Sequence, residues 1–141
     1  MTPRTRIAIA QAGRPVGVIH GLRCTAVICR DVADFDQITQ DIPKGIADLI
    51  FVPGALRQDP DKPLFDPPAY VNDMRALALA TGCWMVQTNW PNALNRPEES
   101  VDAGNSGVVS PAGQLLFRLP NEAAGVGVFN MGERSFTWHA Q

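Results

Sequence analysis

Apolar residues in the N-terminal part of the chain occur in short runs that are typical of β-strands. Residues 6–11 and 16–19 form two such runs, and Cys24–Ile28 forms a third. His20 and Gly21 provide a turn signal between the second and the third run. The pattern therefore predicts antiparallel strands that lead into a central strand.

After this third run the apolar pattern changes from the period of a strand to that of a helix. Apolar residues between 35 and 42 recur at near-helical spacing, and Asp34 with Gln37 resembles a capping box. Pro43 stops this helix. Residues 47–52 are then almost continuously apolar, which predicts a strand covered on both faces.

The clearest helical pattern covers Ala69–Thr81. Tyr70, Met74 and Leu77 fall on one stripe, the composition is rich in alanine, and Gly82 is placed as a C-cap. We therefore expect one face of this helix to be buried against a sheet.

Four more strands are predicted towards the C-terminus. Residues 83–90 form the first, and 107–109 with 115–117 form a hairpin around a turn at Ser110–Gly113. Residues 126–129 form a last short strand. Strands that alternate with helices predict a mixed α/β layer fold.

Composition limits the class of protein. A chain of 141 residues with 45% hydrophobic content fits a single domain that covers residues 1–141. Twelve Lys and Arg against fourteen Asp and Glu leave no basic stripe, so nucleic acid is not an expected partner. The apolar runs are far shorter than the roughly 20 residues that cross a bilayer, and no signal-peptide core follows the basic start. We expect a cytoplasmic protein without a membrane partner.

The three cysteines are odd in number and lack metal-type spacing. This argues against both a disulfide framework and a zinc site, so reduced thiols and no cofactor are expected. Cys29 is the strongest chemical candidate, because the apolar run before it ends abruptly in Arg30 and Asp31. A buried structural cysteine is the alternative interpretation.

A free thiol has a pKa of about 8.5 and needs a base to act as a nucleophile at neutral pH. No Asp, Glu or Lys lies within residues 1–28. His20 or His139 would have to form a Cys-His dyad with Cys29 if the chain were an unrelated α/β thiol hydrolase.

Four segments also occur in an order and at spacings that characterise a known family. They are Val27–Asp31, Gly45–Pro53, Met74–Ala78 with Thr81–Asn89, and Gly104–Gly113. Together they resemble the C-terminal half of the nitrilase superfamily of carbon-nitrogen hydrolases. The resemblance implies a layered αββα sandwich that is incomplete at its N-terminal side.

The same resemblance implies a Cys-Glu-Lys triad that attacks nitriles or linear amides through an acyl intermediate. Cys29 takes the position of the nucleophile. The Glu and the Lys of the family precede the cysteine, where residues 1–28 offer neither. The substrate-binding candidates that the resemblance implies are Arg30, Pro53, Asn89 and Trp90. The backbone N–H of Arg30 is expected to donate a hydrogen bond to the oxyanion that forms during the reaction.

Several polar residues also have structural interpretations. Asp31 is expected to stabilise the turn after the cysteine, and the Arg30 side chain is either solvated or paired with it. Ser106 is expected to make a structural hydrogen bond, Lys44 to be a solvated charge at a helix end, and Trp84 to lie in the core.

The sequence thus predicts an amidase or nitrilase that acts on a small-molecule amide or nitrile. A half sandwich leaves apolar surface uncovered, so a homo-oligomer or a complementing subunit is expected. The alternative is a catalytically incomplete binding or assembly module derived from the nitrilase fold.

Overall fold

The computed structural model describes residues 14–54, 69–89, 104–119 and 125–140. The predicted strand at residues 6–11 and the candidate Trp90 lie outside these ranges. The elements in chain order are β1 (Gly17–Ile19), β2 (Leu22–Ala26), the 3-10 helix η1 (Cys29–Ala33), α1 (Phe35–Asp41), β3 (Leu49–Gly54), α2 (Ala69–Thr81), β4 (Trp84–Asn89), β5 (Gly107–Val109), β6 (Leu115–Arg118), β7 (Gly125–Asn130) and β8 (Ser135–Ala140).

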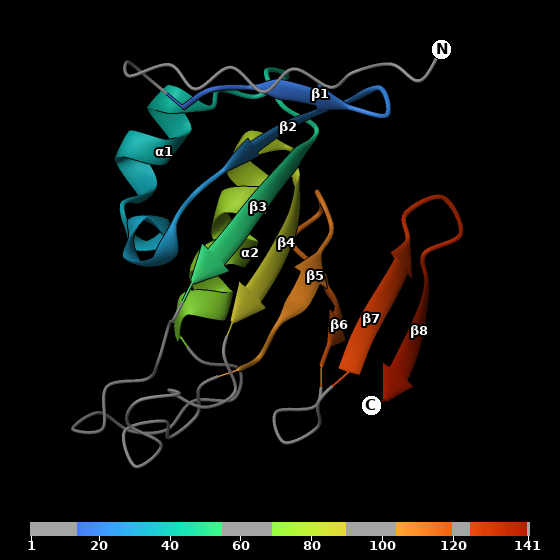
Figure 1. Cartoon of the computed structure of the whole chain (residues 1–141). Coiled ribbons are helices and arrows are strands. Elements are labelled where there is room, and N and C mark those ends of the chain that lie inside the picture. The colour runs from blue at the N-terminus through green and yellow to red at the C-terminus, as the bar shows by residue number, and fades with distance from the viewer. Residues whose placement is uncertain (1–13, 55–68, 90–103, 120–124, 141) are drawn as a thin grey trace, which may run out of the picture.

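A six-stranded mixed sheet organises the fold, with strand order β1-β2-β3-β4-β5-β6. Strands β2, β3 and β4 are parallel, and β1, β5 and β6 pair antiparallel on either side of them. Figure 1 shows α2 behind this sheet, and α1 packs against α2. The predicted mixed α/β class and the predicted antiparallel pairing before the central strand are confirmed.

Both predicted helices form, and both end where the sequence indicates. The Asp34 carboxylate accepts a hydrogen bond from the Gln37 backbone N–H at 3.4 Å, which caps α1. Helix α2 covers Ala69–Thr81, and its C-cap Gly82 has a φ of +70° and donates its N–H to the Ala78 carbonyl at 2.8 Å. Neither described helix has the length and apolar character needed to cross a bilayer.

The hydrophobic core lies between these helices and one face of the sheet. Ile50 and Val52 of β3 are fully buried there, together with Met85 of β4. The stripe predicted on α2 supplies the opposite wall, because Met74 and Leu77 are 1% and 0% exposed. The core therefore fixes the sheet against α2.

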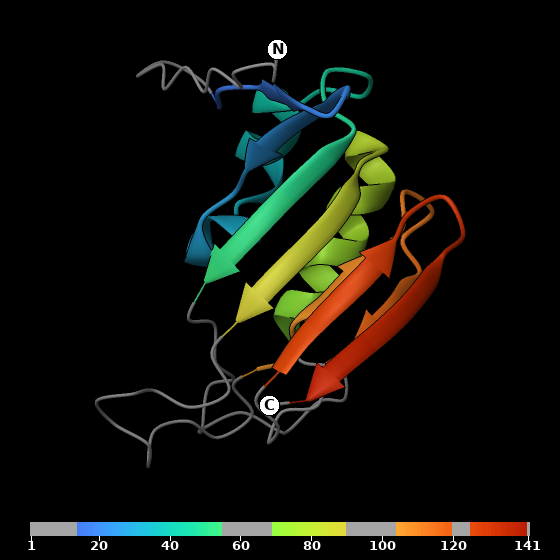
Figure 2. The same ribbon diagram turned by 45° about the vertical axis from the view of Figure 1, so that its right-hand side comes forward.

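The opposite face of the sheet is covered only in part. The strands β7 and β8 form a separate two-stranded sheet, which lies in front of β5 and β6 in Figure 2. It packs through Phe129 against Trp84, with ring centroids 5.7 Å apart. Phe51 of β3 remains 37% exposed. The prediction that both faces of this strand are covered was wrong, because the β7–β8 hairpin does not bury Phe51.

The last strand, β8, was not predicted, since we expected one strand at 126–129 to end the sheet. Phe136 and Trp138 alternate with more polar residues, which is the period-two pattern of a strand. The side chain of Asn130 closes the turn before it by accepting hydrogen bonds from the N–H groups of Gly132 and Glu133, at 3.0 and 3.1 Å.

An ion pair joins the amino ends of β2 and β3. Arg23 Nη2 lies 2.6 Å from Asp48 Oδ1, and Arg23 also donates to the Gly45 carbonyl. The hydrogen bonds from Arg23 lower the pKa of Asp48 to about 2.

This pair predicts a pH dependence of stability. The folded-state pKa of Asp48 lies below its unfolded value of about 3.9. The ion pair therefore contributes to the free energy of unfolding above that pH, and this contribution is lost as the pH falls through about 2. Thermal unfolding midpoints at pH 6 and pH 2 should therefore differ less for Asp48→Asn than for the unaltered chain. Asp36→Asn, which removes an exposed carboxylate from α1, should leave the difference unchanged. An identical pH response of Asp48→Asn and the unaltered chain would contradict the assignment.

Candidate active site

Cys29 opens the short helix η1, three residues after the end of β2. Its φ is +53°, a left-handed conformation that non-glycine residues rarely adopt and that costs on the order of 1–3 kcal/mol. Cys29 is partly exposed, whereas Cys24 and Cys83 are buried, and all three thiols are free. A strained residue at a sharp strand-to-helix turn is a common way to present a nucleophile.

This turn is held by backbone hydrogen bonds on both sides of the cysteine. The Val27 N–H donates to the Phe51 carbonyl at 2.9 Å, and the Asp31 N–H donates to the Ile28 carbonyl at 3.1 Å. Val32, in the same short helix, is 1% exposed and belongs to the core. The position of Cys29 is therefore fixed by β3 and the core.

The strain at Cys29 can be measured by comparing two substitutions. Glycine adopts a positive φ at no steric cost, so Cys29→Gly should be more stable than Cys29→Ala by about 1 kcal/mol in urea unfolding. In α2, by contrast, alanine should be more stable than glycine, so Ala76→Gly should lower the free energy of unfolding by about 1 kcal/mol. If Cys29→Ala proves the more stable of the pair, the left-handed turn is absent.

Asp31 has a structural role next to the cysteine. Its carboxylate lies 3.5 Å from Arg14 Nη1, and Arg14 Nε lies 3.4 Å from Asp41 at the end of α1. Arg14 thus links the turn that contains Cys29 to the following helix. This agrees with the interpretation of Asp31 as a residue that stabilises the turn. The side chain of Arg30 lies outside what the structure describes.

The parallel strands bring most of the remaining candidates to one edge of the sheet. In parallel strands the carboxyl ends meet at the same edge, which is where α/β folds bind ligands. Cys29 follows the end of β2, Pro53 is exposed near the end of β3, and Asn89 ends β4. The register pairs Pro53 with Thr88, one residue before Asn89. Cys29, Pro53 and Asn89 therefore lie at a common edge, which forms the candidate site.

Asn89 belongs to a buried polar cluster at this edge. Its N–H donates to Ser106 Oγ at 2.8 Å, and the Ser106 hydroxyl donates to the Asn89 carbonyl at 3.1 Å. Its side-chain amide donates to the Gly104 carbonyl at 2.9 Å. Asn105, whose φ is +54°, donates to the hydroxyl of Tyr70 at 3.2 Å. Ser106 thus makes the structural hydrogen bonds that the sequence predicts, whereas the participation of Tyr70 and Asn105 was missed.

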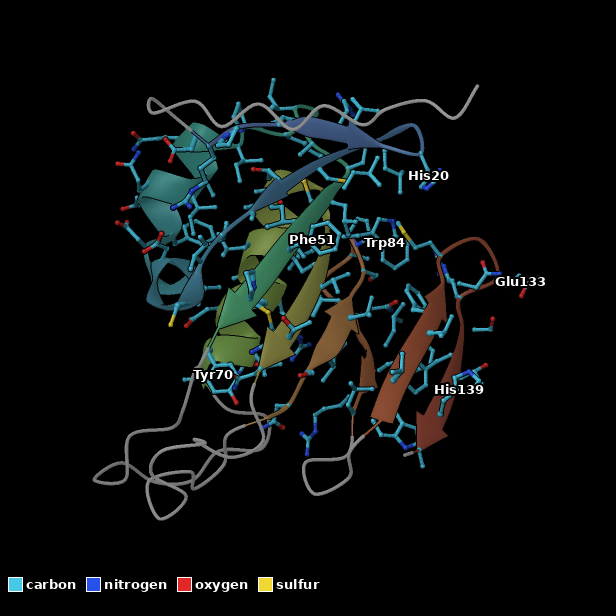
Figure 3. All side chains as sticks on the ribbon, in the orientation of Figure 1. His20, Phe51, Tyr70, Trp84, Glu133 and His139 are labelled. Atoms are coloured by element: carbon cyan, nitrogen blue, oxygen red, sulfur yellow. The ribbon has the colours of Figure 1, made fainter. Side chains whose placement is uncertain are left out.

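The two histidines do not provide a base. His20 (φ +49°) and Gly21 (φ +83°) are the central residues of the β1–β2 hairpin turn, at the amino end of β2. The whole of β2, at roughly 3.3 Å per residue, separates this turn from Cys29. His139 lies on β8, away from η1, and Figure 3 shows both histidines far from Tyr70 at the candidate edge. The hypothesis of a Cys-His dyad was therefore wrong.

Acidic and basic partners of the family type are also distant in the described part of the chain. Glu133 and Lys44 are its only Glu and Lys. Lys44 is exposed before β3, at the edge opposite Cys29, as expected of a solvated charge. Glu133 lies in the β7–β8 turn, where Figure 3 labels it. No three His, Cys, Asp or Glu side chains gather as metal ligands would in these ranges.

Gln87 of β4 is a buried amide near this edge. It is 2% exposed, and neither its side-chain oxygen nor its nitrogen has a hydrogen-bond partner in the described structure. An unsatisfied buried polar group costs about 1–3 kcal/mol. Gln87→Met, which keeps the size of the side chain, is therefore expected to raise the free energy of unfolding by about 1–3 kcal/mol in urea titrations.

Two threonines provide a matched control for this prediction. The Thr25 hydroxyl is buried without a partner, whereas the Thr81 hydroxyl donates to the Leu77 carbonyl at 2.7 Å. Thr25→Val should therefore be neutral or stabilise the fold by up to about 1 kcal/mol, whereas Thr81→Val should destabilise it by about 1 kcal/mol. A lower stability of Gln87→Met would show that the amide has a partner in solution.

Comparisons with known proteins identify the fold. No protein-family model matches the chain, and no curated protein matches it in sequence. The crystal structure of an amidase from Nesterenkonia sp. has 26% identity and a TM-score of 0.59, and the match covers 82% of this chain and 40% of that one.

Two variants of the amidase from Nesterenkonia sp. AN1 match over the same share of this chain, 82%. One shows the Michael addition of acrylamide at its active-site cysteine, with 26% identity, a TM-score of 0.57 and 41% of its length covered. The other carries the acetamide moiety of fluoroacetamide on that cysteine, with 25% identity, a TM-score of 0.59 and 40% coverage. Further structures describe this amidase as a member of the nitrilase superfamily.

This chain spans about 40% of the length of the solved amidases that it matches. The resemblance carried by its four sequence segments is confirmed at the level of the fold. The chain has the fold of nitrilase-superfamily amidases and corresponds to a C-terminal-like part of it.

Proposed function

We propose that this chain is a carbon-nitrogen hydrolase module that acts on a small linear amide through an acyl-enzyme on Cys29. One observation carries the proposal: Cys29 stands in a strained turn at the carboxyl edge of a sheet whose fold is that of amidases. In the neighbouring amidases, acrylamide or the acetamide moiety of fluoroacetamide is attached to the active-site cysteine. A nitrile is the alternative substrate.

In the proposed reaction the Cys29 thiolate attacks the amide carbonyl carbon. The tetrahedral oxyanion is stabilised by the backbone N–H of Arg30. The proton taken from the thiol passes to the amide nitrogen, so that collapse of the adduct releases ammonia and leaves a thioester. Water then attacks the thioester, which regenerates the thiol and releases a carboxylic acid. Pro53, Asn89 and Trp90 border the substrate in this proposal.

The reaction needs a base for the thiol and a cation near the oxyanion. Lys44 and Glu133 are the only Lys and Glu of the described ranges, and both lie away from the candidate edge. The family resemblance places the Glu and the Lys before the cysteine, where residues 1–28 have neither, so we propose that a second copy or a complementing subunit supplies these groups. The exposed Phe51 on the partly covered sheet face supports such a partner, because apolar sheet surface favours association. We further propose one partial domain at residues 1–141, cytoplasmic, with reduced thiols and no cofactor, nucleic-acid partner or membrane partner.

The second candidate function is a binding or assembly module without turnover. The placement of Lys44 and Glu133, the only Lys and Glu of the described ranges, away from the candidate edge favours it, since a thiol without a base is a poor catalyst. In this case the candidate site would bind an amide but would not hydrolyse it.

Ammonia release from acetamide and acrylamide distinguishes these functions. A missing general base lowers rates by about 10²–10⁴, so the purified chain should be slower than the Nesterenkonia amidase by at least that factor. Cys29→Ala should abolish residual release, whereas Cys24→Ala should not. Amidase-like turnover by the chain alone, lost in Cys29→Ala, would eliminate the binding module and the need for a partner. Equal residual release by Cys29→Ala would instead eliminate Cys29 as the nucleophile.

A further inference from the structure

A cavity of about 350 Å³ lies between the six-stranded sheet and the β7–β8 hairpin. Its walls include Trp84, Val86 and Val108 from the sheet, Leu119 directly after β6, and Phe129 and Phe136 from the hairpin. We propose that this cavity binds a small, neutral, apolar molecule with an aromatic ring or a short aliphatic chain. The proposal does not depend on the amidase function, because Cys29 is not among the cavity-lining residues.

The floor of the cavity is the sheet face that points away from α2. Trp84 and Val86 alternate along β4 with the core residue Met85, so they face the hairpin. Val108 of β5 pairs with Val86 and extends the same apolar surface. No charged side chain lines the cavity in the described structure, which favours a neutral ligand.

The roof is an aromatic cluster held close to the sheet. The ring of Phe136 from β8 stacks on Phe117 from β6 of the sheet, with centroids 4.7 Å apart, and the centroid of Phe129 from β7 lies 5.2 Å from that of Phe117. Gly127 allows this approach, because a Cβ there would come within 2.7 Å of the Phe136 ring and 2.9 Å of Leu119. The hairpin therefore covers one side of the cavity.

The size and the roof decide between possible occupants. The volume falls in the lower part of the range of small-ligand pockets, about 300–1,000 Å³. The hairpin packs on this part of the sheet through the contacts of Phe129 with Trp84 and Phe117, which favours a small molecule over a strand or helix of another chain as the occupant. The lining is mainly aromatic and aliphatic, with Gln87, Thr88 and Ser106 as its polar members, so it suits a single apolar ring.

The test is ¹⁹F NMR titration of fluorobenzene against the full chain, with ¹⁹F-labelled benzoate as the charged comparison. Val86→Phe fills the cavity from its floor. Val126→Phe is the matched control, because Val126 is 56% exposed and does not line the cavity. Circular dichroism reports whether each variant is folded, and the smaller change Val86→Leu replaces Val86→Phe if the latter is not.

Saturable binding of one fluorobenzene per chain is expected. Its dissociation constant should rise at least tenfold in Val86→Phe, or by a smaller factor in Val86→Leu, and stay unchanged in Val126→Phe. Fluorobenzoate should bind at least tenfold more weakly. The proposal is overturned if binding does not saturate or is indifferent to Val86. It is also overturned if sedimentation shows that fluorobenzene dissociates an oligomer, because the occupant would then be a second copy.

Discussion

Replacing Leu77 by alanine is expected to lower the free energy of unfolding by about 2–5 kcal/mol. Leu77 is fully buried on the stripe of α2 that faces the sheet. Truncation removes apolar contact and leaves a cavity, since a close-packed core relaxes only in part. Urea unfolding followed by circular dichroism measures the loss.

The same helix offers a matched control for this substitution. Leu79 lies two residues further along α2 and is 58% exposed. Leu79→Ala should therefore change stability by less than about 0.5–1 kcal/mol, as is usual for surface substitutions. Equal losses at Leu77 and Leu79 would mean that α2 does not pack on the sheet through the predicted stripe.

The second large effect is expected in the reactivity of the three thiols. Cys24 and Cys83 are 6% and 0% exposed, and burial raises the pKa of both thiols, which lowers their thiolate fraction. Cys83 Sγ also donates to the Ala47 carbonyl at 3.2 Å. Iodoacetamide should therefore alkylate Cys29 at least about tenfold faster than either of the others, as measured by peptide mass spectrometry.

Denaturation supplies the control for thiol selectivity. In concentrated urea the burial of Cys24 and Cys83 is lost, so all three cysteines should react at similar rates. Labelling of Cys24 or Cys83 as fast as Cys29 in the folded chain would place the accessible thiol elsewhere.

Local patterns predicted much of the fold. The stripe Tyr70, Met74 and Leu77 with Gly82 gave the bounds of α2 because helix period and C-cap are both local signals. The exposure of Phe51 was not predictable from its apolar run, since it depends on how far a distant hairpin reaches across the sheet. The strand β8 was missed although Phe136 and Trp138 carry the alternation of a strand.

The candidate site shows the same division between local and long-range signals. The abrupt end of an apolar run and the family resemblance pointed to Cys29, and the parallel strands place Pro53 and Asn89 at the same edge. The positive φ of Cys29 could not be predicted, because it is imposed by contacts with β3 and the core. The cluster around Asn89 likewise depends on Tyr70, a residue distant in sequence.

The concentration dependence of fluoroacetamide addition to Cys29 tests the central claim most directly. We predict slow labelling that rises linearly with fluoroacetamide concentration and disappears in Cys29→Ser, because the described residues offer the thiol neither a Glu nor a Lys at the candidate edge. Rapid, saturable labelling of the chain alone, abolished by Cys29→Ser, would show an assembled site and would contradict the claim that catalysis requires groups from a partner.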